Sequence, residues 1–174
     1  MKKLLSPLLA IVLLGGLWFA LSSPAQAPQV TFSMLDGRQM TPADLKGRVV
    51  LVNFWATSCG RCVAEMPELV DTYKRYHARG FEVVAVAMSY DPPNRVLNFA
   101  QKNALPFPVA LDIDGSLAMA FGDVQGTPTT FVIDQKGNIV RRLVGVLDFA
   151  ALHTLLDKKL FPAETGSPLG RTSS

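Results

Sequence analysis

The sequence predicts an α/β domain of three layers, with helices on both faces of a largely parallel sheet. Two nearly continuous apolar runs, residues 49–54 and 81–88, have the composition of strands that are buried on both faces. The segment between them, residues 60–77, carries apolar residues at helical spacing. A strand, a helix and a second strand in this order form the crossover unit from which parallel sheets are built.

Further elements extend this unit at both ends. Residues 30–40, with Asp36-Gly37 at their centre, predict an N-terminal β-hairpin. Residues 91–111 add a helix and a short strand in the middle of the fold, and Asp148 is the expected N-cap of the last helix. The elements expected after the second apolar run are a helix over 95–102, a short strand over 107–111, a short helix over 115–121, antiparallel strands over 129–134 and 138–144, and a helix ending near 160. This order is that of a thioredoxin-like three-layer fold with an N-terminal β-hairpin and a central βα insertion.

The N-terminus has the pattern of a signal peptide or an N-terminal membrane anchor. Residues 1–27 combine two lysines, an apolar stretch over 4–21 and a small-x-small cleavage site at Ala25-Gln26-Ala27. Pro28 directly after this site disfavours cleavage, and lysines before an apolar stretch keep the N-terminus in the cytoplasm. We therefore expect the domain on the periplasmic or extracytoplasmic face of the inner membrane, either anchored or secreted.

The rest of the chain is expected to form one thioredoxin-like domain, residues 28–161, followed by a mobile tail, residues 162–174, rich in Pro, Gly, Ser and Thr. Without Lys2 and Lys3 the formal net charge falls from +3 to +1. The basic residues are scattered rather than gathered in a stripe, so we expect no nucleic-acid partner. We expect a monomer.

Cys59 and Cys62 are the only cysteines in the chain, and they follow the first apolar strand directly. A C-x-x-C pair that ends a strand and opens a helix is typical of a dithiol/disulfide redox site. Cys59 at the helix start is the expected nucleophile, because the helix N-terminus favours a thiolate. Cys62, one turn into the helix, is the expected resolving thiol. Arg61 between them adds a positive charge that would favour the thiolate, although a solvated surface arginine fits equally well.

Two structural interpretations of the cysteine pair have less support. A zinc site needs four ligands, and His77 and His153 lack the spacing to complete one with the cysteines, so we expect no metal. A purely structural disulfide that closes so short a loop would stabilise the fold little. We also expect no bound cofactor.

Two residues near the cysteines are candidates for supporting roles. Glu65 lies three residues after Cys62, on the same face of the predicted helix. Its carboxyl group could accept the proton of Cys62 when that thiol attacks a mixed disulfide; the alternative is an exposed glutamate stabilised by the helix dipole. Trp55, four residues before Cys59, is expected either to shield the disulfide and offer a contact surface for a substrate or to be a core tryptophan at a strand end.

A second candidate site segment is Gly126-Thr127-Pro128, which precedes a β-branched strand. This context suits a tight turn with a cis peptide bond before Pro128. Such a turn would leave the backbone of Thr127 free to pair with an extended substrate segment. The alternative is a trans proline at the start of an edge strand.

Residues 52–67, VNFWATSCGRCVAEMP, resemble the active-site signature of the TlpA/ResA-type thioredoxin-like proteins, which are anchored or periplasmic disulfide reductases of bacteria. Residues 126–130 resemble the loop that carries the family's cis-proline, and residues 91–111 match the family's insertion in length and position. The resemblance covers about residues 30–160. It implies an extracytoplasmic thiol–disulfide oxidoreductase that works in the reductase direction, on protein disulfides such as those of apocytochrome c or a copper-site protein. It also implies a transmembrane electron donor of the CcdA or DsbD kind.

Two other functions would use the same cysteines. A copper-binding or copper-delivery module could hold the metal through Cys59 and Cys62 as soft ligands, but the related copper chaperones have a wider cysteine spacing and a ligand histidine. A thiol peroxidase would carry a P-x3-[TS]-x2-C pattern, and here Ala56 stands three residues before Cys59.

Overall fold

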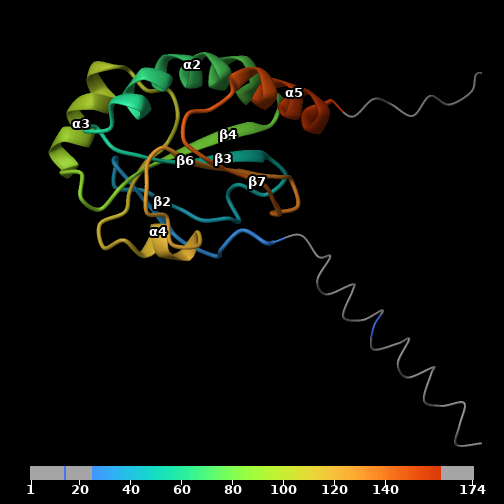
Figure 1. The fold of residues 1–174 in the computed structure, drawn as a ribbon, viewed down its shortest axis with the longest axis horizontal. Coiled ribbons are helices and arrows are strands. Elements are labelled where there is room, and N and C mark those ends of the chain that lie inside the picture. The colour runs from blue at the N-terminus through green and yellow to red at the C-terminus, as the bar shows by residue number, and fades with distance from the viewer. Residues whose placement is uncertain (1–13, 15–24, 162–174) are drawn as a thin grey trace, which may run out of the picture.

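The computed structural model describes residue 14 and residues 25–161 (Figure 1). The predicted signal peptide or anchor and the predicted mobile tail fall outside the described residues, except for residues 14 and 25–27. Among the residues described, no helix has the length and apolar composition needed to cross a bilayer.

A seven-stranded sheet lies at the centre of the fold, in the order β2-β1-β5-β4-β3-β6-β7. Its three middle strands, β3 (Val49–Trp55), β4 (Phe81–Ala87) and β5 (Val109–Leu111), are parallel. The antiparallel strands at the two sides are β1 (Phe32–Met34), β2 (Gln39–Met40), β6 (Thr129–Ile133) and β7 (Ile139–Val144). The predicted N-terminal hairpin, parallel centre and C-terminal antiparallel pair are all confirmed.

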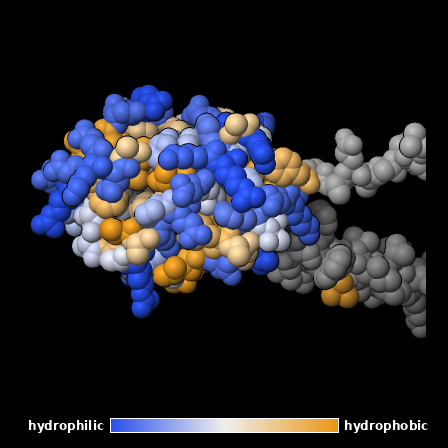
Figure 2. All heavy atoms as spheres, turned by 90° about the horizontal axis from the view of Figure 1, so that it is seen from above, coloured by the Kyte–Doolittle hydropathy of each residue, from blue (hydrophilic) through white to orange (hydrophobic). Residues whose placement is uncertain are grey.

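Helices cover both faces of this sheet, as expected for three layers. The helices are α2 (Gly60–Tyr76), α3 (Pro93–Lys102), α4 (Ser116–Ala120) and α5 (Phe149–Leu160), with a 3-10 turn over His77–Arg79. Figure 1 shows α2, α3 and α5 on one face and α4 on the other. Alternate side chains of β3 separate accordingly: Val49 and Leu51 join the core under α2 and α5, whereas Val50 and Val52 join the core under α4. The face seen in Figure 2 is mostly hydrophilic, with hydrophobic side chains gathered in small patches.

The sheet order brings two distant loops together at one edge. β3 ends at Trp55, and the antiparallel strand β6 begins beside this end, with Thr129 opposite Phe54. The loop before β6 therefore meets the loop that leads from β3 into α2. These are the two segments that the sequence predicts for the active site.

Residues that precede the predicted domain start at residue 28 are hydrogen-bonded to the domain. The N–H of Ile139 donates to the carbonyl of Ala25 at 2.7 Å, and the N–H of Ala27 donates to the carbonyl of Gly137 at 2.8 Å. Gln26 and Asn138 form an isolated β-bridge between these bonds. Residues 25–27, the predicted cleavage site, are thus paired with the turn between β6 and β7.

Candidate active site

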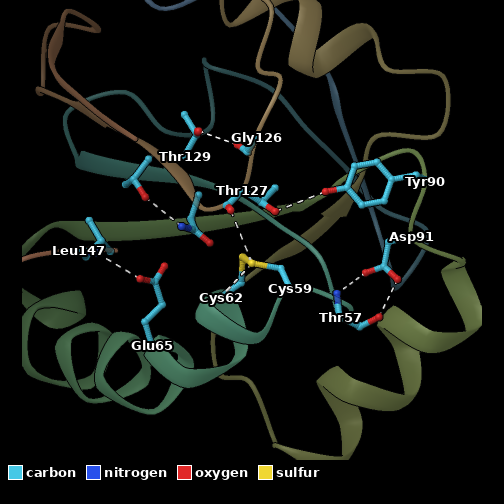
Figure 3. Close-up of a disulfide and its surroundings, with 12 residues drawn as sticks. Thr57, Cys59, Cys62, Glu65, Tyr90, Asp91, Gly126, Thr127, Thr129 and Leu147 are labelled. Carbon is cyan, nitrogen blue, oxygen red and sulfur yellow. Dashed lines mark hydrogen bonds between the residues drawn. A yellow bond between two sulfur atoms is a disulfide. The ribbon is translucent and has the colours of Figure 1, made fainter. Parts of the chain in front are cut away.

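Cys59 and Cys62 form a disulfide at the start of α2 (Figure 3). Cys59 is the N-cap of the helix, and its Sγ accepts a hydrogen bond from the N–H of Cys62 at 3.2 Å. Cys62 is completely buried, whereas Cys59 is partly exposed. The prediction that Cys59 is the more accessible sulfur is confirmed, so a partner in solution can reach Cys59 and not Cys62.

The loop before β6 lies against the accessible sulfur. The peptide bond between Thr127 and Pro128 is cis, as the sequence predicts. The carbonyl oxygen of Thr127 lies 3.7 Å from Sγ of Cys59. Two hydrogen bonds hold the loop in place: the hydroxyl of Thr129 donates to the carbonyl of Gly126 at 2.7 Å, and the N–H of Gly145 donates to the carbonyl of Pro128 at 2.8 Å.

Glu65 lies in the interior and not on the helix surface. Its side chain is 5% exposed, and its Oε2 accepts a hydrogen bond from the N–H of Leu147 at 3.2 Å, while Oε1 is buried without a partner. Burial raises the pKa of the Glu65 carboxyl, although the hydrogen bond from Leu147 and the nearby amide of Asn53 oppose this effect. The alternative of an exposed glutamate is therefore wrong for Glu65, whereas Glu68 is exposed.

A buried amide near this carboxyl joins the strands β3 and β6. Asn53 of β3 is completely buried and donates to the hydroxyl of Thr130 in β6 at 2.9 Å. Its side chain also lowers the pKa of the Glu65 carboxyl, against the effect of burial. Sequence analysis missed Asn53, although a single amide within an otherwise apolar strand was a usable signal, because a buried polar group requires a partner.

A second polar connection lies on the other side of the disulfide and was also missed. The carboxylate of Asp91, 4% exposed, accepts hydrogen bonds from the N–H and the hydroxyl of Thr57, the latter at 2.6 Å. The neighbouring Tyr90 places its hydroxyl 3.4 Å from Oγ1 of Thr127. In the view of Figure 3, Thr57, Tyr90 and Asp91 lie on the Cys59 side of the disulfide, and Glu65 lies on the Cys62 side. No local pattern predicts the Asp91–Thr57 contact, because 34 residues separate the two.

Trp55 does not offer the contact surface that was one of its predicted roles. Its side chain is 0% exposed and packs against Phe99 of α3, with ring centroids 5.1 Å apart. The strand β3 is covered on both faces at this position, so its last side chain points into the core. Trp55 is the core tryptophan of the alternative interpretation.

Arg61 is exposed and takes part in no salt bridge within residues 25–161.

The two histidines lie apart from the cysteines, in polar contacts of their own. Nδ1 of His77 is 3.0 Å from Nη2 of Arg48, and Nε2 of His153 is 2.9 Å from Oγ1 of Thr72. In the described part of the chain, no three His, Cys, Asp or Glu side chains are grouped so that they could hold a metal ion.

The site thus combines one accessible sulfur at a helix N-terminus, a second sulfur buried behind it, and a buried carboxyl with a raised pKa on the same helix. This arrangement, on a thioredoxin-like fold, defines a thiol–disulfide oxidoreductase, because it separates attack on a partner from release of that partner.

Comparison with known proteins agrees with this class. The family model described as Redoxin matches residues 23–156. The chain is 33% identical to the thiol-disulfide oxidoreductase ResA of Bacillus subtilis (strain 168) over 146 residues, which cover 84% of this chain and 80% of that protein. It is 34% identical to ResA of Geobacillus thermodenitrificans over 128 residues, which cover 74% and 72%. The crystal structure of a thiol:disulfide interchange protein of the thioredoxin family from Chlorobium tepidum superimposes with a TM-score of 0.73 at 32% identity, over 80% of this chain and 98% of that one.

The chain therefore belongs to the Redoxin family and, within it, to the thiol–disulfide oxidoreductases of the TlpA/ResA type.

Proposed function

We propose that the protein is an extracytoplasmic disulfide reductase that passes two electrons from the Cys59–Cys62 dithiol to a disulfide of a partner protein. The observation that carries this proposal is the unequal exposure of the two sulfurs, with Cys59 beside the loop of Thr127 and Cys62 buried. We further propose apocytochrome c or a copper-site protein as the substrate, on the strength of the similarity to ResA-type proteins.

The exchange begins with the reduced enzyme. The thiolate of Cys59 attacks one sulfur of the substrate disulfide, the substrate S–S bond breaks, and one substrate thiolate leaves. A mixed disulfide between Cys59 and the substrate results. The helix N-terminus stabilises the attacking thiolate, and the N–H of Cys62, which bonds Sγ of Cys59 in the disulfide form, is placed to do the same.

Resolution takes place on the buried side. Cys62 passes its proton to Glu65 and attacks Sγ of Cys59, which releases the second substrate thiolate and forms the Cys59–Cys62 disulfide. Burial raises the pKa of the Glu65 carboxyl and so brings it closer to the pKa of a thiol. A carboxylate with such a pKa accepts the proton of a thiol more readily. The substrate has gained two electrons and the enzyme has lost two.

A new cycle requires reduction of the enzyme disulfide by an external dithiol. We propose a transmembrane electron carrier of the CcdA or DsbD kind, which would deliver electrons from the cytoplasm. The N-terminal lysines and the apolar stretch after them support placement of the domain outside the cytoplasm.

The direction of electron flow is tested by the equilibrium potential of the Cys59–Cys62 couple, measured against glutathione with alkylation of free thiols. A reductase requires a potential of about −220 mV or lower, in the range of thioredoxin and glutaredoxins. A value near that of the oxidant DsbA, about −120 mV, would show that the protein inserts disulfides instead. Reduction of a disulfide peptide from an apocytochrome c haem site, compared with a peptide from a copper site, tests the substrate.

A further inference from the structure

Tyr90 is an exposed aromatic residue with a polar contact at the reacting sulfur. Its side chain is 59% exposed, and its hydroxyl lies 3.4 Å from Oγ1 of Thr127. The carbonyl of the same Thr127 is 3.7 Å from Sγ of Cys59. Exposed tyrosines are common, and exposure alone would carry no argument. Here, however, the ring is tied to the residue that flanks the sulfur to which a substrate becomes bonded.

The backbone that carries Tyr90 is fixed to the active-site loop. Asp91 accepts hydrogen bonds from both the N–H and the hydroxyl of Thr57, two residues before Cys59. On the other side of Tyr90, the N–H of Met88 donates to the carbonyl of Trp55 at 3.0 Å, and Met88 accepts from the N–H of Asp91 at 2.9 Å. Because the loop is held at both ends, little conformational entropy remains to be lost when a substrate contacts the ring.

Apolar surface also lies on the other side of the Thr127 loop. Val144 and Val146 are 74% and 59% exposed, and the N–H of Gly145 between them is bonded to Pro128. A substrate segment laid along this loop therefore meets an aromatic ring on one side and aliphatic side chains on the other. This combination favours an apolar segment over a charged one, because a charged side chain packed against Tyr90 or the two valines would lose water without gaining a partner among them.

We propose that Tyr90 is a specificity-determining residue, which selects substrate segments with an apolar or aromatic side chain next to the reacting cysteine. The distances support this role. Successive residues of an extended segment are about 3.3 Å apart, so the neighbour of a cysteine bonded to Cys59 lies beside Thr127, which the hydroxyl of Tyr90 also contacts. This inference rests on the proposed function and deepens it, because it defines the chemistry of the protein substrate.

The test compares peptides that differ only next to their cysteine. Each peptide is a mixed disulfide with glutathione and carries Phe, Leu, Ala or Asp on both sides of the cysteine. Hydroxyethyl disulfide serves as a substrate without a peptide segment. The kcat/KM is measured for the wild type, Tyr90→Ala and Tyr90→Phe. Met119→Ala is the matched control, because Met119 is 66% exposed on α4, on the opposite face of the sheet.

We expect the wild type to prefer the Phe and Leu peptides over the Asp peptide. In Tyr90→Ala the ratio of kcat/KM for the Phe peptide to that for hydroxyethyl disulfide should fall about tenfold, the order of effect that one apolar contact has on selectivity. Tyr90→Phe should retain most of the preference, and Met119→Ala all of it. The reduction potential should be the same in all four proteins.

Two results would overturn the inference alone: a wild type that reduces every substrate without preference, or a Tyr90→Ala variant in which all substrates, hydroxyethyl disulfide included, lose the same factor. The second result would mean that Tyr90 only supports the fold of the site. A wild type that reduces none of these disulfides would overturn the proposed function, and the inference with it.

Discussion

The two sulfurs of the disulfide are bonded to each other but lie in opposite surroundings. Cys59 is partly exposed, at a helix N-terminus, between two loops of hydrogen-bonded polar groups, one containing Thr57 and the other Thr127. Cys62 is buried, and the titratable group on its side, Glu65, is buried as well. The difference shows how one C-x-x-C motif can give two chemically identical thiols different roles. The exposed sulfur can attack a partner disulfide, and the buried sulfur can react only afterwards, with the mixed disulfide on Cys59.

Removal of the exposed sulfur is the strongest test of the different roles of Cys59 and Cys62. Cys59→Ser should reduce disulfide reductase activity by about a thousandfold or more, because the buried Cys62 cannot reach a partner disulfide. The rate of peptide disulfide reduction by the reduced variant measures this loss. Substantial activity in Cys59→Ser would mean that Cys62 becomes accessible on reduction and that the contrast holds only for the disulfide form.

Removal of the buried sulfur should give a different defect. Cys62→Ser should still attack, but it should accumulate the mixed disulfide because nothing resolves it. Non-reducing gels and mass spectrometry after incubation with a disulfide peptide detect the adduct, and Cys59→Ser serves as the control that forms none. A Cys62→Ser protein that releases its substrate as quickly as the wild type would contradict the assigned roles.

Glu65→Gln keeps the shape of the buried side and removes its charge and its proton acceptor. Resolution of the mixed disulfide should slow about a hundredfold, the usual effect of losing a general base. The pKa values of the thiols should fall, because a nearby carboxylate no longer opposes a thiolate. Stopped-flow reduction of a disulfide peptide and thiolate absorbance against pH measure the two effects separately. Glu68→Gln, an exposed change on the same helix, is the control; equal behaviour of the two variants would refute the role of Glu65.

The sequence alone was sufficient for the elements of this comparison that are close in the chain. Helix spacing placed Glu65 on the face of Cys62, and the strand-to-helix junction placed Cys59 at the exposed end. It was not sufficient for contacts between segments far apart in the chain, such as Leu147 with Glu65 of α2 or Asp91 with Thr57, because these depend on how the elements meet in space. Trp55 shows a related limit: a residue next to a redox motif can be as deeply buried as any in the core.

The raised pKa of Glu65 also makes stability depend on pH. A carboxyl whose pKa is higher in the folded protein than in the unfolded chain binds its proton more tightly when folded, which favours the folded state at low pH. This contribution is complete below the ordinary value of 4.5 and is lost as the pH rises through the raised pKa. The free energy of unfolding of the oxidised wild type, relative to Glu65→Gln, should therefore fall across this window. Urea denaturation at a series of pH values measures it, and a constant difference would contradict the raised pKa.

The smallest effect is expected on the exposed side. Thr57→Val removes the hydroxyl that donates to Asp91 but keeps the backbone N–H bond, so the free energy of unfolding should fall by about 1 kcal/mol. Thr154→Val, in which an exposed hydroxyl on α5 is lost, is the control and should change little. A Thr57→Val protein that matches this control would show that the connection between the two loops does not contribute to stability.

The hydrogen bond from the N–H of Cys62 to Sγ of Cys59 connects folding to electron affinity. Oxidation and unfolding form a closed thermodynamic cycle, so any contact that differs in strength between the two redox forms changes both quantities by the same free energy. A thiolate accepts this hydrogen bond more strongly than a disulfide sulfur does, which favours the reduced form, whereas the buried carboxyl of Glu65 works against a thiolate. A fold that makes the couple more reducing than an unfolded C-x-x-C peptide is one in which the influences against the thiolate prevail, and its oxidised form then resists urea better than its reduced form. Each 1.4 kcal/mol of difference in unfolding free energy between the two redox forms corresponds to about 30 mV of reduction potential. Urea denaturation curves of the oxidised and reduced protein therefore measure how far folding shifts the potential from that of an unfolded C-x-x-C peptide.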